Sequence, residues 1–130
     1  MVFTATVGVR DVLYSCTLGA EPVQLSPAGD HSIGGWSYAA GCDTHLLSLV
    51  GPANGGDLWL LRPGAAPTKA TSLYDRIAAK YALPRCEAIR WAGADGVEVE
   101  GLLWHPIGRQ DGDPPAPLLV QTHGGPSHGR

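Results

Sequence analysis

The sequence predicts a mostly β fold, in which about two blades of a β-propeller precede the first strands of an α/β domain. Three observations support this prediction: short apolar runs between glycine and proline turns, an internal repeat, and a last apolar run that leads into a glycine-rich turn. The 130 residues include 18 glycines and 11 prolines, and only 16% are charged. Turns should therefore be frequent and helices few.

The repeat joins Leu13–Ser26 to Leu58–Thr71, which align without a gap at a spacing of 45 residues. Each copy predicts a strand, a glycine-containing turn and a short extended return. Two more strand-like runs, Ser32–Ala40 and His45–Val50, lie between the copies. About four short strands per period are typical of propeller blades, which we place at residues 1–71. An unrelated β-sandwich fragment is the alternative interpretation.

Residues 72–86 differ in character and predict a connector with a short helix. Asp75 is a candidate N-cap, Ile77 and Tyr81 have helical spacing, and Pro84 marks the end of the helical pattern.

Residues 87–130 predict the start of a second domain. Two strand candidates, Ala88–Trp91 and Val97–Trp104, flank the turn Ala94-Asp95-Gly96, which is a strong hairpin signal. A polar, proline-rich loop follows. Leu118–Val120 is then fully apolar, as expected for a short strand inside an α/β sheet.

The last apolar run leads directly into His123, Gly124, Gly125 and Pro126, which are the candidate catalytic residues. Glycine permits unusual backbone angles, and two successive N–H groups in such a turn can stabilise an oxyanion. Ser127 lacks the strand–elbow–helix setting of a nucleophile. No Asp, Glu or Cys accompanies the histidines of this turn, so we expect neither a metal nor a cofactor.

Composition excludes several other functions. The net charge of −3 and the lack of any Lys/Arg cluster argue against nucleic-acid binding. No apolar run approaches the ~18 residues of a membrane span, and the N-terminus lacks signal-peptide features. Cys16, Cys42 and Cys86 are scattered, which predicts reduced thiols and a cytoplasmic protein.

Other conspicuous residues favour structural roles. The four tryptophans predict core or inter-strand packing. Asp57 and Arg62 are interpreted as ordinary charges at a blade edge. Glu98 and Glu100 alternate with apolar residues and predict the solvated face of a strand.

Taken together, the motifs resemble the prolyl oligopeptidase family of serine peptidases, especially its acylaminoacyl peptidase and dipeptidyl peptidase-like branches. Asp95–Pro106 resembles the family's D-G-x-x-x-x-G-x-x-x-x-P segment, and Pro117–Pro126 resembles its P-L-x-V-x-x-H-G-G-P segment. The paired blade ends precede both motifs in the order that the family shows. The resemblance covers essentially the whole chain.

The resemblance implies a β-propeller set over an α/β-hydrolase domain that cleaves short peptides through an acyl-enzyme. It places the oxyanion loop at His123–Pro126, with a backbone N–H near Gly125 as donor. The sequence contains no G-x-S-x-G elbow, and the Ser, Asp and His of a triad are missing. We therefore expect a fragment that is inactive alone, whose full-length enzyme would bind peptide substrates and could form a homo-oligomer.

Two alternatives stay open. The chain could be a non-catalytic β-rich binding module, or the product of a decayed gene, in which His-Gly-Gly-Pro is only a turn. An esterase of the α/β-hydrolase fold fits His-Gly-Gly but not the repeat.

Overall fold

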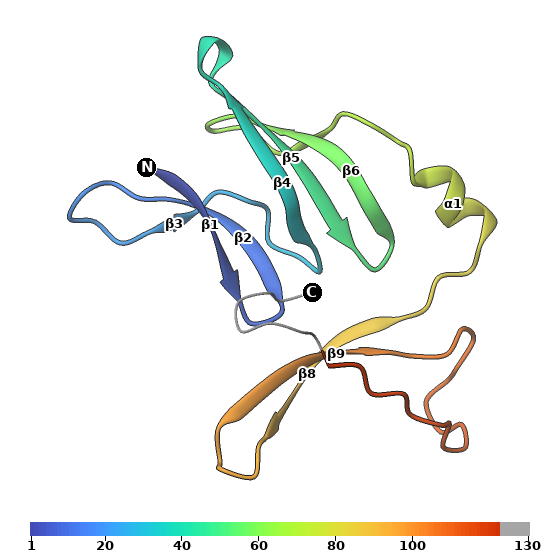
Figure 1. Cartoon of the computed structure of the whole chain (residues 1–130). Helices are drawn as coiled ribbons and strands as arrows, with labels where there is room; N and C mark the ends of the chain where they lie inside the picture. Colours follow the sequence, from blue (N-terminus) through green and yellow to red (C-terminus); the bar gives the residue numbers. More distant parts are fainter. Residues whose placement is uncertain (123–130) are drawn as a thin grey trace.

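The computed structural model describes residues 1–122, which form three small antiparallel sheets and one short α-helix (Figure 1). The prediction of a mostly β chain is confirmed. The described residues form neither a closed propeller nor an α/β-hydrolase sheet. The predicted oxyanion loop, His123–Pro126, lies outside them.

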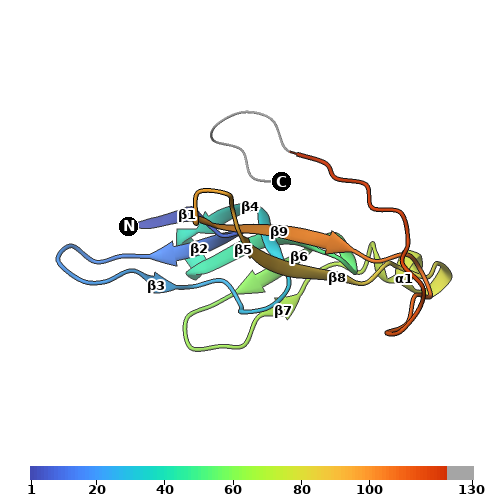
Figure 2. The same ribbon diagram turned by 90° about the horizontal axis from the view of Figure 1, so that it is seen from below.

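The first two sheets are antiparallel meanders of unequal size. The first contains three strands: β1 (Val2–Val7), β2 (Arg10–Ser15) and β3 (Val23–Gln24). The second contains four strands: β4 (Ser32–Ala39), β5 (Thr44–Gly51), β6 (Asn54–Leu61) and β7 (Thr68–Lys69). Seen from below, the strand order of both sheets runs in the same direction (Figure 2).

The repeat predicted from the sequence has a direct structural counterpart. The Leu13 N–H donates to Ser26 Oγ at 3.2 Å, and the Leu58 N–H donates to Thr71 Oγ1 at 2.9 Å. The Leu13 carbonyl also accepts a hydrogen bond from the Leu25 N–H. In the second copy, the Leu58 carbonyl accepts the equivalent hydrogen bond from the Ala70 N–H. The two copies therefore share their conformation, including the return of the chain onto the preceding strand.

The hydrophobic core lies between these two sheets. Leu13 of β2 and Leu47 of β5 are completely buried, and Ile33 and Leu49 complete the buried cluster. The Asp11 N–H of β2 donates to Ser32 Oγ of β4 at 2.8 Å, which adds a polar tie between the sheets. Side-chain burial and this hydrogen bond fix how one sheet stacks on the other.

The predicted connector helix is present as α1 (Asp75–Lys80), but Asp75 is not its N-cap. The cap residue is Tyr74, which makes no side-chain capping bond. Asp75 lies in the first turn, where a carboxylate is favoured by the helix dipole, and its side chain pairs with Lys69. The sequence predicts Asp75 as the helix cap, but its carboxylate forms an ion pair with the Lys69 ammonium instead.

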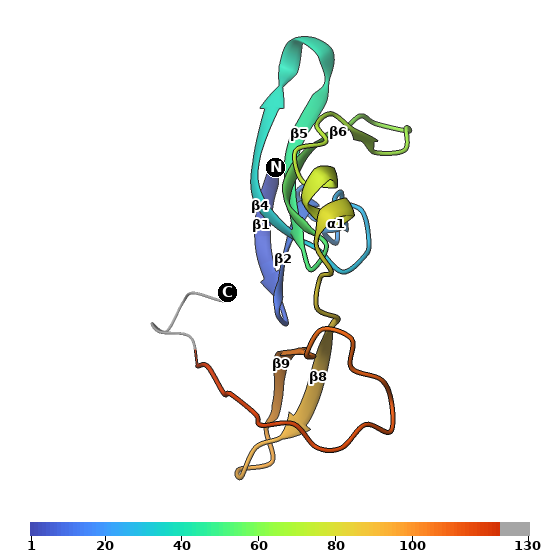
Figure 3. The ribbon, with the colours of Figure 1, turned by 90° about the vertical axis from the view of Figure 1, so that its right-hand side faces the viewer.

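The third sheet is the predicted hairpin, formed by β8 (Cys86–Ala92) and β9 (Glu98–Trp104). Gly96 has a φ of +79°, a backbone angle that glycine adopts without strain. The Val97 N–H donates to Asp95 Oδ1 at 3.1 Å and stabilises the turn. The hairpin follows the connector and lies at one end of the molecule (Figure 3).

The strand predicted at Leu118–Val120 is not formed. These three side chains are 74%, 90% and 73% exposed, and no strand begins after β9 in the described part of the chain. A fully apolar strand is stable only between neighbouring strands and covering helices. No such layer surrounds residues 118–120 within the described structure.

Of the two roles predicted for the tryptophans, core packing is found for Trp59, and the other three lie in strands opposite cross-strand neighbours. Trp59 packs against the buried cluster, whereas Trp36, Trp91 and Trp104 are 37%, 48% and 50% exposed. Trp36 lies opposite the buried Leu47, at the margin of the face that packs against the first sheet, and Trp91 and Trp104 lie on the two-stranded hairpin.

Truncation of Leu47 should destabilise the chain strongly, because its side chain is completely buried between the sheets. We expect Leu47→Ala to lower the free energy of unfolding by about 2–5 kcal/mol in urea denaturation followed by tryptophan fluorescence. Leu18→Ala is the control, because Leu18 is fully exposed and should change stability by less than about 0.5 kcal/mol. Equal effects of the two substitutions would contradict the stacked-sheet core.

Candidate functional site

Within residues 1–122, the most highly connected polar group is the buried carboxylate of Asp57 on β6. Thr71 Oγ1 and the Leu73 N–H each donate to its Oδ1 at 2.8 Å. Lys69 Nζ lies 3.0 Å from Oδ2 as an ion-pair partner. All three partners follow β6 in the chain, so the carboxylate holds the return strand and the start of the connector.

These contacts determine the charge states of the cluster. Burial alone would raise the pKa of Asp57, but hydrogen bonds from Thr71 and Lys69 and from the Leu73 N–H lower it below its usual range. The pKa of Lys69 is raised, because its ammonium bonds to Asp75 and to Asp57. The cluster is therefore a stable anion–cation pair near neutral pH.

The interpretation of Asp57 as an ordinary charge at a blade edge is wrong, because its side chain is completely buried. The repeat carried a signal that could have identified it. In the alignment at a spacing of 45 residues, Asp57 takes the place of Val12. A charge at a position that is apolar in the other copy indicates a buried, paired group.

A second polar network closes the base of the β8–β9 hairpin. His105 Nε2 lies 2.8 Å from Glu87 Oε1, and Arg85 approaches the same carboxylate at 3.4 Å. The His105 hydrogen bond is the main cause of a lowered pKa of Glu87, assisted by the charge of Arg85. Because Glu87 belongs to β8 and His105 directly follows β9, the network ties the two strands together.

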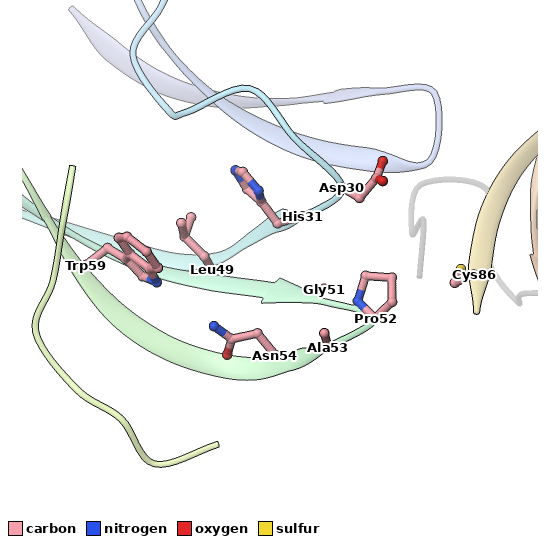
Figure 4. Close-up of a pocket in the computed structure, with 9 residues that line it drawn as sticks. All are labelled: Asp30, His31, Leu49, Gly51, Pro52, Ala53, Asn54, Trp59 and Cys86. Carbon is pink, nitrogen blue, oxygen red and sulfur yellow. The ribbon is translucent and has the colours of Figure 1, made fainter. Parts of the chain in front are cut away.

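A cavity of about 360 Å³ lies between the second sheet and the hairpin (Figure 4). Its walls combine apolar and polar residues: Asp30, His31, Leu49, Gly51, Pro52, Ala53, Asn54, Trp59 and Cys86. His31 Nε2 bonds to the Pro27 carbonyl at 2.9 Å, which commits one ring nitrogen to the loop. Burial raises the pKa of the Cys86 thiol, with Asp30 adding to the effect, so the thiol stays protonated and is a poor nucleophile.

The described residues thus hold structural ion pairs and no catalytic constellation. Residues 1–122 contain no group of three or more His, Cys, Asp or Glu side chains that could hold a metal ion. No helix among them has the length and apolar character that crossing a membrane requires. The candidate oxyanion residues, His123, Gly124, Gly125 and Pro126, are not among the residues whose geometry is described.

Similarity to a known protein bears on function. No protein-family model matches the chain. The chain is similar to uncharacterized peptidase YuxL of Bacillus subtilis (strain 168), with 28% identity over 123 residues. The matched segment is 92% of this chain and 17% of YuxL, so the chain spans only a small part of the relative's length. The relation is distant, partial and to a peptidase.

Because the pKa of Asp57 is lowered in the folded chain, the free energy of unfolding should fall at acid pH. Because the folded-state pKa lies below the unfolded value of about 3.9, ionised Asp57 stabilises the fold above that pH. This contribution is lost as pH falls through the folded-state pKa. We expect Asp57→Asn to destabilise the chain at pH 7, and the difference in Tm from the parent chain to shrink steadily below pH 4.

The matched control is Asp30→Asn, which removes an exposed carboxylate paired with Arg10. Exposed ion pairs contribute little, so this variant should stay close to the parent chain at every pH. A constant Tm difference for Asp57→Asn from pH 7 to pH 2 would show that its ionisation does not stabilise the fold.

Proposed function

We propose that this chain is part of a serine peptidase of the prolyl oligopeptidase type, comprising the end of its propeller and the start of its hydrolase domain. The observation that carries the proposal is the similarity to peptidase YuxL across 92% of the chain. The proposed substrates are short peptides and the proposed location is the cytoplasm.

The two stacked sheets support the propeller part of the proposal. They repeat at 45 residues, contain equivalent hydrogen bonds and are both meanders in which consecutive strands are neighbours. Blades of a propeller are four-stranded antiparallel sheets that follow one another in this manner. The second sheet has all four strands and the first has three.

The hairpin and the segment after it support the hydrolase part. The Asp95-Gly96 turn joins β8 to β9 at the position of the family-like motif Asp95–Pro106. A proline-rich stretch then precedes Leu118–Val120. These apolar residues are exposed in the described structure, and the neighbouring strands and helices of a hydrolase sheet would cover them.

In the intact enzyme, a serine would attack the peptide carbonyl while a histidine takes its proton and an aspartate orients the imidazole. Backbone N–H groups of the His123–Pro126 loop, with that of Gly125 as the principal donor, would stabilise the tetrahedral oxyanion. The acyl-enzyme would then be released by water. The Asp57 cluster would anchor the connector that leads from the propeller to the hydrolase domain.

The 130-residue chain alone should be catalytically silent, because it contains no G-x-S-x-G elbow to present a nucleophile. We expect a fluorophosphonate probe to leave every serine unlabelled, as judged by intact-mass spectrometry. A serine hydrolase of known activity, treated in parallel, verifies the probe. Stoichiometric labelling of one serine would disprove the assignment of this chain to the non-nucleophilic part of the enzyme.

The transcript that encodes the chain tests the peptidase proposal itself. Sequencing it beyond the codon of Arg130 should reveal a G-x-S-x-G elbow, followed in order by an Asp and a His that complete the triad. A stop codon directly after Arg130 would favour the non-catalytic β-rich module. An elbow without propeller sequence upstream of Met1 would favour the esterase.

A further inference from the structure

Glu100 of β9 joins the hairpin to the first sheet. Its side chain is only 17% exposed, whereas that of Glu98, two residues earlier on the same face of β9, is 68% exposed. The sequence predicts a solvated strand face for both residues. This prediction is wrong for Glu100, because its carboxylate lies against Gly8 in the turn between β1 and β2.

The close approach depends on the absence of a side chain at position 8. Gly8 has a φ of +59°, and a methyl group on its Cα would overlap Glu100 Oε2. Glycine therefore lets the carboxylate lie directly on the backbone of the turn, and the N–H groups of tight turns attract anions. The other carboxylate oxygen, Oε1, lies 3.7 Å from Arg90 Nη2 on β8.

The hairpin is held at two separate places. At its start, the connector leaves the second sheet from the Asp57 network, which fixes Thr71 and Leu73. At its far side, β9 lies beside the turn of β1 and β2, as Figures 1 and 3 both show. Between these places, Cys86 faces the second sheet across the cavity of about 360 Å³, so the hairpin is not tightly packed there. Glu100 thus supplies the close contact that fixes the hairpin.

We infer that Glu100 and Gly8 form a latch, which holds the hairpin against the two stacked sheets and whose release lets the hairpin swing about the connector. The inference rests on contacts within residues 1–122 and not on the peptidase proposal, so either can fail alone. Glu100 is a positioning residue in this arrangement, because its carboxylate sets the orientation of β8 and β9. In the proposed enzyme, the latch would set the angle between the propeller and the hydrolase domain.

The test follows the motion of the hairpin in the 130-residue chain by NMR relaxation. In the parent chain, backbone order parameters should be about 0.85 in all three sheets. The carboxylate ends a flexible side chain, so a methyl group at position 8 displaces it without distorting the turn. In Gly8→Ala, the order parameters of β8 and β9 should therefore fall below about 0.6 while those of β5 keep their values.

Gly19→Ala is the matched control for the backbone change. Gly19 also has a positive φ, of +82°, but a methyl group there meets no atom within 4 Å. Both substitutions place a side chain on left-handed backbone, so both should lower the Tm by a similar amount. Only Gly8→Ala should loosen the hairpin.

Glu100→Ala opens the latch from the other side and leaves the turn unchanged. It should lower the order parameters of β8 and β9 as far as Gly8→Ala does. The double variant should show no further drop, because the two residues form one contact. Glu98→Ala is the control, since Glu98 shares the strand face and the Arg90 partner but is exposed, and the hairpin should stay rigid in it.

Three results would overturn the inference. They are a hairpin that is already mobile in the parent chain, a hairpin that stays rigid in Glu100→Ala, and equal loosening by Glu98→Ala. Loss of the NOE between the Gly8 and Glu100 side-chain protons verifies that the contact is broken in each variant. If Gly8→Ala does not fold, Glu100→Ala alone decides, because it changes no backbone position.

Discussion

The packing of Leu13 against Leu47 and Leu49 is the interaction on which the rest of this structure depends. It joins two sheets through different faces, because Leu13 corresponds in the repeat to Leu58, which is paired with Ser48 and so lies on the opposite face from Leu47. With only two stacked sheets in the described structure, such head-to-tail stacking uses one face of each sheet. Within residues 1–122, each sheet therefore keeps one face open.

The buried carboxylate of Asp57 determines how the chain continues after β6. A carboxylate removed from water is costly unless every partner is in place, so only one path of the following chain is compatible with it. Lys69, Thr71 and Leu73 supply those partners from alternate residues of one extended segment. The segment is consequently fixed against β6 before α1 begins, and the hairpin β8–β9 follows from a defined exit point.

The sequence predicts local features of this fold well and features that depend on neighbours poorly. The strands of the repeat and the Asp95-Gly96 hairpin are right, because alternation and turn chemistry act over a few residues. The prediction for Asp57 is wrong, since its burial is decided by partners up to 16 residues away. Leu118–Val120 has the composition of an interior strand, but the layers that would make it one are not among the described residues. The proposed oxyanion loop remains a prediction from sequence.

The resolved pKa shifts among residues 1–122 follow from hydrogen bonding, ion pairing and burial. Here the pKa values of Asp57 and Glu87 are lowered and that of Lys69 is raised, so all three stay charged. The pKa of Tyr38 is raised by its bond to Asp43 and that of Cys86 by burial, so both stay neutral. Each shift leads away from neutrality, as ion pairing and burial require in a structural framework.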